Sequence, residues 1–254
     1  MTYHNAESKV FKCPHCKDSR WILYEKRAGD AVGEDGKPVY PGEQYTIPYA
    51  KPCRYCMGDD RRRTLFKESG IPFQYSVNQN KFDWNAYGFE DVERKKQAAI
   101  NYVSNFEDVK NGGVGLYLWS HKNGTGKTSL ACSIGNALLN KSVSVKYLPA
   151  VEILDAASGG ILNEYEKCDV LILDDIGKKR TGAEFYEETL LKLIDTRYTR
   201  KVCTIFTSNL PLDALEIDPA VFSRVKARVL CIEMPEIDIR GAEDESAKEI
   251  LLRL

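Results

Sequence analysis

The chain reads Trp119-Ser120-His121-Lys122-Asn123-Gly124-Thr125-Gly126-Lys127-Thr128, and this stretch governs how the rest of the sequence is interpreted. An apolar run precedes it at residues 115–118 and an apolar-periodic run follows it, so it joins a predicted strand to a predicted helix. Glycines at such a junction let backbone N–H groups curl around phosphate oxygens, and the helix N-terminus adds its positive dipole. The stretch therefore predicts a phosphate-binding P-loop.

The residue types in this P-loop predict ATP and Mg²⁺ as its ligands. The Lys127 ammonium is expected to reach the β- and γ-phosphates, and the Thr128 hydroxyl to ligate Mg²⁺. The first glycine of the usual pattern is His121 here, while the cradle that follows is intact. The residues expected to hold the nucleotide are Asn123, Gly124, Thr125, Gly126, Lys127, Thr128 and Ser129.

Two carboxylates follow a second apolar run. Residues Val170–Leu173 lead directly into Asp174 and Asp175. Ligands of open α/β sheets bind at the carboxyl ends of the strands, so both carboxylates are expected at the phosphate site. Asp174 is expected to hold the Mg²⁺ shell through water, and Asp175 to polarise the attacking water. An acidic turn after a strand would explain one carboxylate but not the pair.

Two further segments are expected to serve the same chemistry. A third apolar run ends in Ser208 and Asn209, and the Asn209 amide is expected to read the γ-phosphate and orient water. An Asn after a strand is otherwise a turn former. Arg224 and Arg228 precede the last apolar run and are expected to reach a neighbouring subunit's γ-phosphate as arginine fingers. The alternative for these arginines is a solvated basic helix face.

Apolar runs and amphipathic runs alternate along the second half of the chain. The strands are predicted at Gly115–Ser120, Val143–Leu148, Val170–Asp174, Cys203–Thr207 and Val229–Glu233. The helices are predicted at Val92–Phe106, Lys127–Asn140, Val151–Ala157, Ala183–Thr199 and from Asp213 to about Lys226, with a break near Pro219. Nearly continuous apolar strands are typical of parallel sheets buried on both faces. An α/β fold with a parallel sheet and flanking helices is therefore expected.

These motifs, in this order, resemble an AAA+ ATPase. Four segments are more closely similar to the DnaC/DnaI family of replicative helicase loaders, and they are Ser69–Pro72, Gly124–Thr128, Leu173–Gly177 and Thr207–Leu210. The resemblance covers about residues 65–235 and extends to the transposition helper IstB, which shares the ATPase core. It implies ATP hydrolysis, an arginine finger at Arg228 with an accessory Arg224 one turn earlier, and no full helical lid. Arg240 is a candidate substitute for an arginine of that lid.

Four cysteines near the N-terminus form two Cys-x-x-Cys pairs, and they are Cys13, Cys16, Cys53 and Cys56. Each pair places two thiolates on one turn, and two such turns complete a tetrahedral Zn²⁺ site. A module of some 50 residues buries too little apolar surface alone, whereas structural zinc contributes about 10–16 kcal/mol in small finger peptides. A structural zinc ion is therefore expected, with a redox dithiol or unpaired thiols as the alternatives. Two β-rich stretches, Arg20–Lys26 and Gln44–Tyr49, lie between the pairs.

Composition and length set the remaining expectations. The 254 residues suit a zinc-ribbon-like module at 1–58, a helical linker at 59–80 and an ATPase domain at 81–254, ending in a helix at Ala242–Leu254. A formal net charge of −1 gives no global attraction to nucleic acid, so DNA contact would need a local cluster such as residues 61–63, 178–180 or 197–201. The chain contains neither an apolar run of about 18 residues nor the pattern of a signal peptide at its start. A cytoplasmic protein without membrane contact is expected.

The resemblance implies an ATP-dependent helicase loader acting in the initiation of DNA replication. Its expected partners are a DnaB-type replicative ring helicase and single-stranded DNA, with a homo-oligomer in the ATP-bound state or on the helicase. Two alternatives stay open: an IstB-like transposition helper ATPase, and a phage-encoded adaptor or inhibitor of the host helicase. A nucleotide kinase with a zinc ribbon is disfavoured, because in such kinases the zinc module follows the P-loop domain.

Overall fold

The computed structural model describes residues 21–27, 46–52, 54–75, 82–88, 92–177 and 183–240. Two compact units make up the chain, Met1–Arg63 and Thr64–Leu254. In the first unit, strands β1 (Trp21–Arg27) and β2 (Thr46–Pro52) pair antiparallel, which confirms the two predicted β-rich stretches. Helix α1 (Arg54–Glu68) begins five residues before the helical linker predicted at 59–80 and contains residues 59–68 of it; residues 69–72 are not helical.

The predicted zinc ligands fall outside what the structure describes. Cys13, Cys16 and Cys53 lie outside the described residues, and so does the side chain of Cys56, the third residue of α1. The zinc site therefore stays a prediction from the sequence.

The second unit is built on a parallel sheet of five strands. The strands are β3 (Gly115–Trp119), β4 (Val145–Pro149), β5 (Val170–Ile176), β6 (Cys203–Ser208) and β7 (Val229–Glu233). Their spatial order is β4-β5-β6-β3-β7, and every neighbouring pair is parallel. All five predicted strands are thus confirmed. The order places β6 between the strand that enters the P-loop and the strand that ends in the two aspartates.

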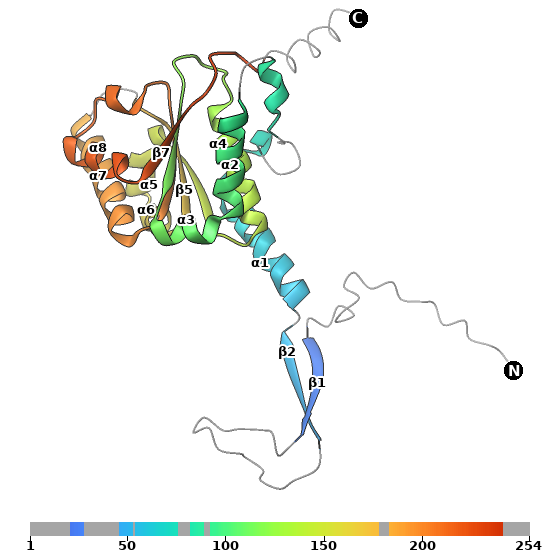
Figure 1. The fold of residues 1–254 in the computed structure, drawn as a ribbon. Helices are drawn as coiled ribbons and strands as arrows, with labels where there is room; N and C mark the ends of the chain where they lie inside the picture. The colour runs from blue at the N-terminus through green and yellow to red at the C-terminus, as the bar shows by residue number, and fades with distance from the viewer. Residues whose placement is uncertain are drawn as a thin grey trace, which may run out of the picture. The chain divides into compact units, whose positions relative to one another are not determined.

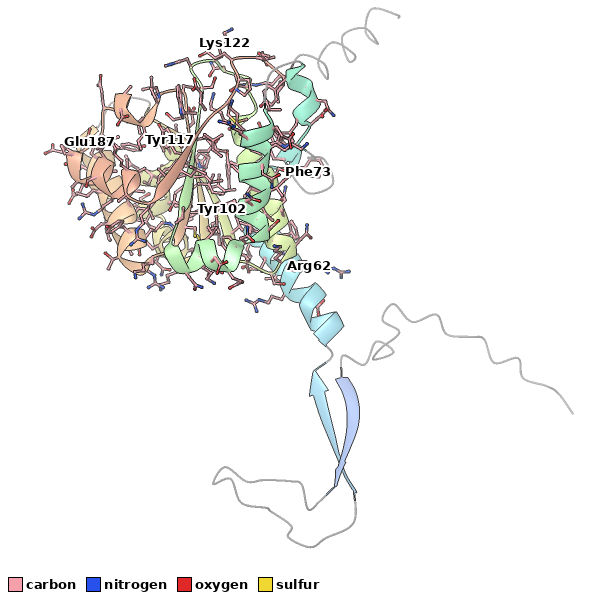
Figure 2. All side chains as sticks on the ribbon, in the orientation of Figure 1. Arg62, Phe73, Tyr102, Tyr117, Lys122 and Glu187 are labelled. Carbon is pink, nitrogen blue, oxygen red and sulfur yellow. The ribbon has the colours of Figure 1, made fainter. Side chains whose placement is uncertain are left out.

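Helices cover both faces of this sheet (Figure 1). The side chains of the strands alternate between the two faces. Leu116 and Leu118 of β3 pack into one core, while Tyr117 packs into the other. The first core is covered by α2 (Glu93–Ser104), α3 (Phe106–Gly112) and α4 (Lys127–Asn140). The second is covered by α5 (Ile153–Ser158), α6 (Leu162–Lys167), α7 (Ala183–Arg200) and α8 (Pro219–Lys226). Side chains fill the space between the sheet and the helices on each face, and Tyr102 lies between α2 and the sheet (Figure 2). Because successive side chains of a strand point to opposite faces, the sheet contributes to two separate cores.

The helices depart from the predicted ones at a few places. The predicted helix Val92–Phe106 divides at Asn105 into α2 and α3. The break predicted near Pro219 is confirmed, because a short 3-10 turn at Leu212–Ala214 precedes it and α8 begins at Pro219, where Asp218 caps the N-terminus by accepting from Ala220 N and Val221 N. Helix α6 was not predicted, and the predicted helix Ala242–Leu254 lies outside the described residues.

The segment that follows α1 runs along the sheet edge toward the P-loop. Tyr147 N, on the outer edge of β4, donates to Ser69 O at 2.7 Å. A 3-10 turn at Phe73–Tyr75 comes next, where the Asn136 side chain of α4 donates to Tyr75 O at 2.6 Å. These contacts place residues 69–75 beside β4 and the carboxyl half of α4. Within the described ranges, no helix combines the length and the apolarity that a membrane crossing requires.

Candidate nucleotide-binding site

The predicted P-loop connects β3 to α4 and turns on two glycines in the left-handed region. Gly124 and Gly126 both have φ of +78°, and Gly126 is the N-cap of α4. A Cβ on Gly124 would lie 2.1 Å from Asp238 Oδ1, and one on Gly126 would lie 2.7 Å from Ile239 Cδ1. The positive φ favours glycine at both positions, and a Cβ there would in addition force the Asp238 and Ile239 side chains to move. Lys122 lies exposed at the outer end of the loop (Figure 2).

Two segments far from the loop in sequence hold it in place. Tyr87, which is only 1% exposed, donates its hydroxyl to Thr125 O at 2.7 Å, and burial raises the pKa of this phenol. The stretch after β7 also contacts the loop, where Ile239 N donates to Gly124 O at 3.0 Å. Neither contact was predicted, because both depend on segments brought to the loop by the tertiary fold.

Lys127 is buried and points back into the curve of the loop. Its ammonium donates to Lys122 O at 2.7 Å, to Ser120 O at 3.3 Å and to Thr125 Oγ1 at 3.3 Å. Burial lowers the pKa of Lys127, and the negative charge of Asp175 opposes that shift. The charge thus sits among oxygen dipoles beside the N-terminus of α4, where the phosphates of a nucleotide would add a stronger counter-charge.

The Asp174 carboxylate accepts hydrogen bonds from three hydroxyl groups. Its Oδ1 accepts from Thr128 Oγ1 at 2.8 Å and from Thr207 Oγ1 at 2.6 Å. Its Oδ2 accepts from Tyr147 OH at 2.8 Å. Hard oxygen donors next to a phosphate site are the ligands that Mg²⁺ prefers. The adjacent Thr128 and Asp174 therefore fit the predicted magnesium site.

Asp175 and Asn209 face each other at the ends of β5 and β6. Asn209 Nδ2 donates to Asp175 Oδ1 at 3.4 Å, and Asp175 N donates to Thr207 Oγ1 at 2.8 Å. Asp175 has φ of +60°, a region that Asp enters more readily than most residues. The β5–β6 register shifts between Leu173 and Ile176, and the two aspartates within this irregularity both line the same cleft.

The P-loop lines one cleft together with both aspartates, Thr207 and Asn209. Its volume of about 380 Å³ is within the range of small-molecule sites. Its walls come from residues 123–129 of the loop and first turn, from both aspartates, and from Thr207 and Asn209. Gln74, Tyr75, Phe82, Asp83 and Ala86 form a further wall, and Ile239 and Arg240 close the rim. The structure therefore brings together every predicted P-loop, carboxylate and amide residue. Arg240 lies at this cleft, and its role stays a prediction.

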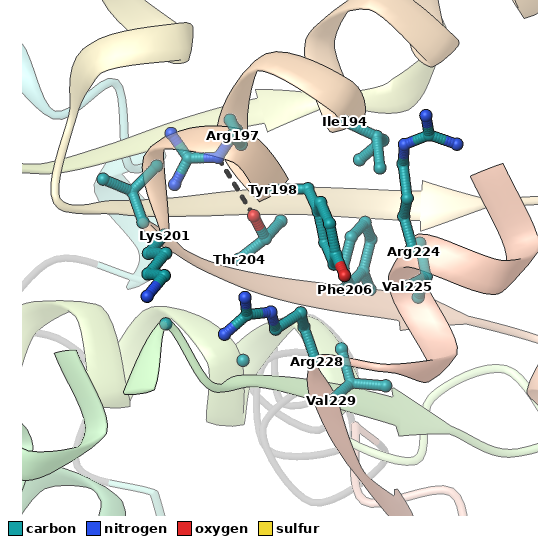
Figure 3. A pocket seen from close by; sticks show the side chains of 13 residues that line it. Ile194, Arg197, Tyr198, Lys201, Thr204, Phe206, Arg224, Val225, Arg228 and Val229 are labelled. Atoms are coloured by element: carbon teal, nitrogen blue, oxygen red, sulfur yellow. Dashed lines mark hydrogen bonds between the residues drawn. The ribbon is translucent and has the colours of Figure 1, made fainter. Parts of the chain in front are cut away.

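Arg224 and Arg228 lie at the other end of the sheet (Figure 3). Gly115 N, at the amino end of β3, donates to Arg228 O, whereas the P-loop leaves the carboxyl end of β3. The Arg228 guanidinium stacks 4.9 Å above the centre of the Tyr198 ring. Arg224 Nε donates to Asp195 Oδ1 at 2.6 Å. The structure therefore separates both arginines from the cleft of their own subunit, and a role in a neighbouring subunit stays a prediction.

The site contains residues that the sequence did not single out. Tyr147 and Thr207 lie within apolar strands, where a tyrosine or threonine is most simply interpreted as part of the core. Tyr87 precedes the first helix predicted in the ATPase domain, and Ile239 follows the last predicted strand. No spacing or periodicity in the sequence marks any of the four.

Sequence comparisons relate the chain to known proteins. A family model described as "IstB-like ATP binding protein" matches residues 59–222. The protein YqaM of Bacillus subtilis (strain 168) is 25% identical over 261 residues, which cover 87% of this chain and 81% of YqaM. The replicative helicase loader DnaC of Escherichia coli (strain K12) is 27% identical over 160 residues, which cover 59% of this chain and 62% of DnaC. The match therefore spans less than two thirds of DnaC.

Solved structures share the fold of the second unit. The crystal structure of DnaI superposes with a TM-score of 0.56 at 22% identity, covering 71% of this chain and all of that chain. The crystal structure of the DnaC helicase loader gives 0.55 at 22% identity, with 65% and 100% covered. The replication initiator DnaA bound to AMPPCP and single-stranded DNA gives 0.52 at 19% identity, with 71% and 56% covered. At these identities the likeness shows the α/β fold alone.

Replacing Lys127 with Ala is expected to abolish stabilisation by ATP, because it removes the cation inside the loop. ATP at 100 times its dissociation constant should add about 2.7 kcal/mol to the unfolding free energy of the wild type. Thermal unfolding with and without ATP measures the difference. Lys122→Ala, which removes an exposed cation from the same loop, should keep the full shift. An equal shift in Lys127→Ala would show that the P-loop is misassigned.

Proposed function

The chain belongs to the family of IstB-like ATP binding proteins, and we propose that it is an ATPase that places a ring helicase on single-stranded DNA when replication begins. The observation that carries the proposal is the convergence of a buried lysine, two carboxylates and an amide on one cleft. The DnaC protein, named as a replicative helicase loader, supports the choice of partner. The expected assembly is a homo-oligomer in the ATP-bound state or on the helicase.

Each residue of the cleft has a role in the proposed hydrolysis. Lys127 and the N–H groups of the loop bind the phosphates and compensate their charge. Bound Mg²⁺ would neutralise the charge that develops on the transferred phosphoryl group. Asp175 accepts a hydrogen bond from the attacking water, and Asn209, only 3.4 Å from that carboxylate, fixes the direction of attack.

A second function is favoured by one observation, the family model itself. Its description names IstB, so an ATPase that assists a transposase instead of a helicase would use the same cleft. The nucleotide chemistry does not distinguish the two partners, and the contact with helicase or transposase does.

Loading can be measured on a closed circle of single-stranded DNA, which a closed ring cannot thread onto. With ATP, the wild-type protein should increase the amount of a DnaB-type helicase retained on the circle; helicases from Bacillus subtilis and Escherichia coli provide the probes.

Asp175→Asn should still bind ATP while its turnover falls by about 10²-fold or more. Asp213→Asn, an exposed carboxylate paired with Lys226 away from the cleft, is the matched control. Failure to retain either helicase, together with ATP-dependent binding of a transposase, would favour the second function.

The proposed function includes one structural zinc ion in the N-terminal unit. Two Cys-x-x-Cys pairs in the sequence support it. Elemental analysis should find one zinc per chain, and the double change Cys53→Ser and Cys56→Ser should remove it while ATP-dependent stabilisation persists. Cys231→Ser, at an exposed cysteine outside this unit, should keep the metal. Wild-type protein purified without chelator and found free of zinc would contradict the site.

The distance of Arg228 from its own cleft supports action in a neighbouring subunit. Arg228→Ala should bind ATP normally and lose the rise of hydrolysis with protein concentration, since trans-acting arginines elsewhere contribute about 10³–10⁵ in rate. Mixing Arg228→Ala with Lys127→Ala should restore activity, because some interfaces then combine an intact loop with an intact arginine. Lys226→Ala, an exposed cation two residues away, should behave as wild type. Co-assembled mixtures without recovered activity would argue for a monomeric switch.

A further inference from the structure

The Tyr147 side chain makes a contact at the cleft that the proposed hydrolysis does not use. Tyr147 lies in β4, next to β5, and is 9% exposed. Its hydroxyl donates to Asp174 Oδ2 at 2.8 Å. The other carboxylate oxygen, Oδ1, already accepts from Thr128 and Thr207. Tyr147 is therefore the donor that holds the second oxygen of this carboxylate.

The backbone of Tyr147 is also held from outside the sheet. Strand β4 lies at the edge of the five-stranded sheet, and Tyr147 N donates to Ser69 O at 2.7 Å across that edge. Ser69 is only 2% exposed, and its hydroxyl donates to Phe66 O at the end of α1 and accepts from Ile71 N. The turn that supports Tyr147 is thus fixed by its own hydrogen bonds. The backbone that bears the Tyr147 phenol is therefore restrained, as a group that orients another side chain requires.

Rotation about the bond that joins the carboxylate to Cβ moves both of its oxygens, so every hydrogen bond to either oxygen opposes that rotation. Both threonines bind the same oxygen, Oδ1, and restrain the carboxylate through that oxygen alone. A donor on Oδ2 restrains the second oxygen as well, so the plane of the carboxylate is fixed more firmly. Water ligands of Mg²⁺ in a near-octahedral shell tolerate little error in the direction of their acceptors, so a fixed plane favours binding of the metal.

We propose that Tyr147 is a positioning residue that orients Asp174 toward Mg²⁺, so that magnesium-dependent nucleotide binding depends on the phenolic hydroxyl. This inference rests on the proposed ATPase function. It assigns to β4 a part in the metal site, beside the loop and β5. Tyr147 touches neither phosphate nor attacking water and acts through Asp174.

The test compares two Tyr→Phe variants that each remove one hydroxyl from a buried ring. Tyr147→Phe removes the donor to Asp174. Tyr102→Phe removes a donor to Val114 O at 3.1 Å, at the amino end of β3 and away from the cleft. Binding of a fluorescent ATP analogue is titrated at increasing Mg²⁺ and again with a chelator present. Thermal unfolding of both variants monitors their stability.

Tyr147→Phe should raise the half-saturating Mg²⁺ concentration about tenfold, the effect of losing one hydrogen bond to a charged group. Binding of the analogue in chelator should stay unchanged, and Tyr102→Phe should match the wild type in both titrations. An unchanged Mg²⁺ requirement in Tyr147→Phe would overturn the inference while leaving the ATP site intact. An equal shift in both variants would also overturn it, because it would trace the effect to lost stability. A wild-type protein that binds no nucleotide would overturn the proposed function and this inference together.

Discussion

The buried carboxylate of Asp174 lies where four elements of the second unit meet. A charge that is largely removed from water needs several hydrogen-bond donors, and here they come from α4, β4 and β6, while Asp174 itself belongs to β5. The strand order makes this possible, because β5 lies between β4 and β6 and each neighbour can present a hydroxyl to it. Thr128 adds the link to the P-loop. The geometry of the cleft therefore depends on the sheet being assembled in this order.

Much of the fold and part of the site could be predicted from the sequence. The strands were predictable because parallel strands buried on both faces are apolar almost throughout. Lys127 was predictable because it begins a helix after a glycine-rich loop, and Asp174 and Asn209 because they lie at the carboxyl ends of strands, where ligands bind. Tyr147 was not predictable, since the feature that matters is a hydroxyl at the end of a ring that otherwise fits the core. Helix α6 was missed because it spans only Leu162–Lys167, less than two turns, too short for a periodic pattern.

The polarity of a parallel sheet explains why some predicted residues are together and others are not. All five strands run in one direction. The loops that leave the strands therefore lie together at their carboxyl ends, and the segments that enter the strands lie together at their amino ends. Asp175 lies at the carboxyl end of β5, Asn209 directly follows β6, and the two meet at the carboxyl ends of the strands. Arg228 precedes β7 and lies at the amino ends of the strands, stacked on Tyr198. The similarity to the structures of DnaI, DnaC and DnaA, at 19–22% identity, extends to the fold of the sheet and does not identify a partner.

The left-handed backbone at Asp175 limits how this chain can diverge. Asp is tolerated at a φ of +60° because its short polar side chain hydrogen-bonds locally, whereas longer residues are disfavoured there. A change from Asp175 to Glu would keep the charge but place a longer side chain on a backbone that suits it poorly, and the contact with Asn209 would have to be rebuilt. A descendant that acquires Glu at this position is therefore expected to relax the turn and change the residue that follows β6 as well. The length of the side chain at position 175, the backbone angle there and the residue that follows β6 are therefore expected to change together.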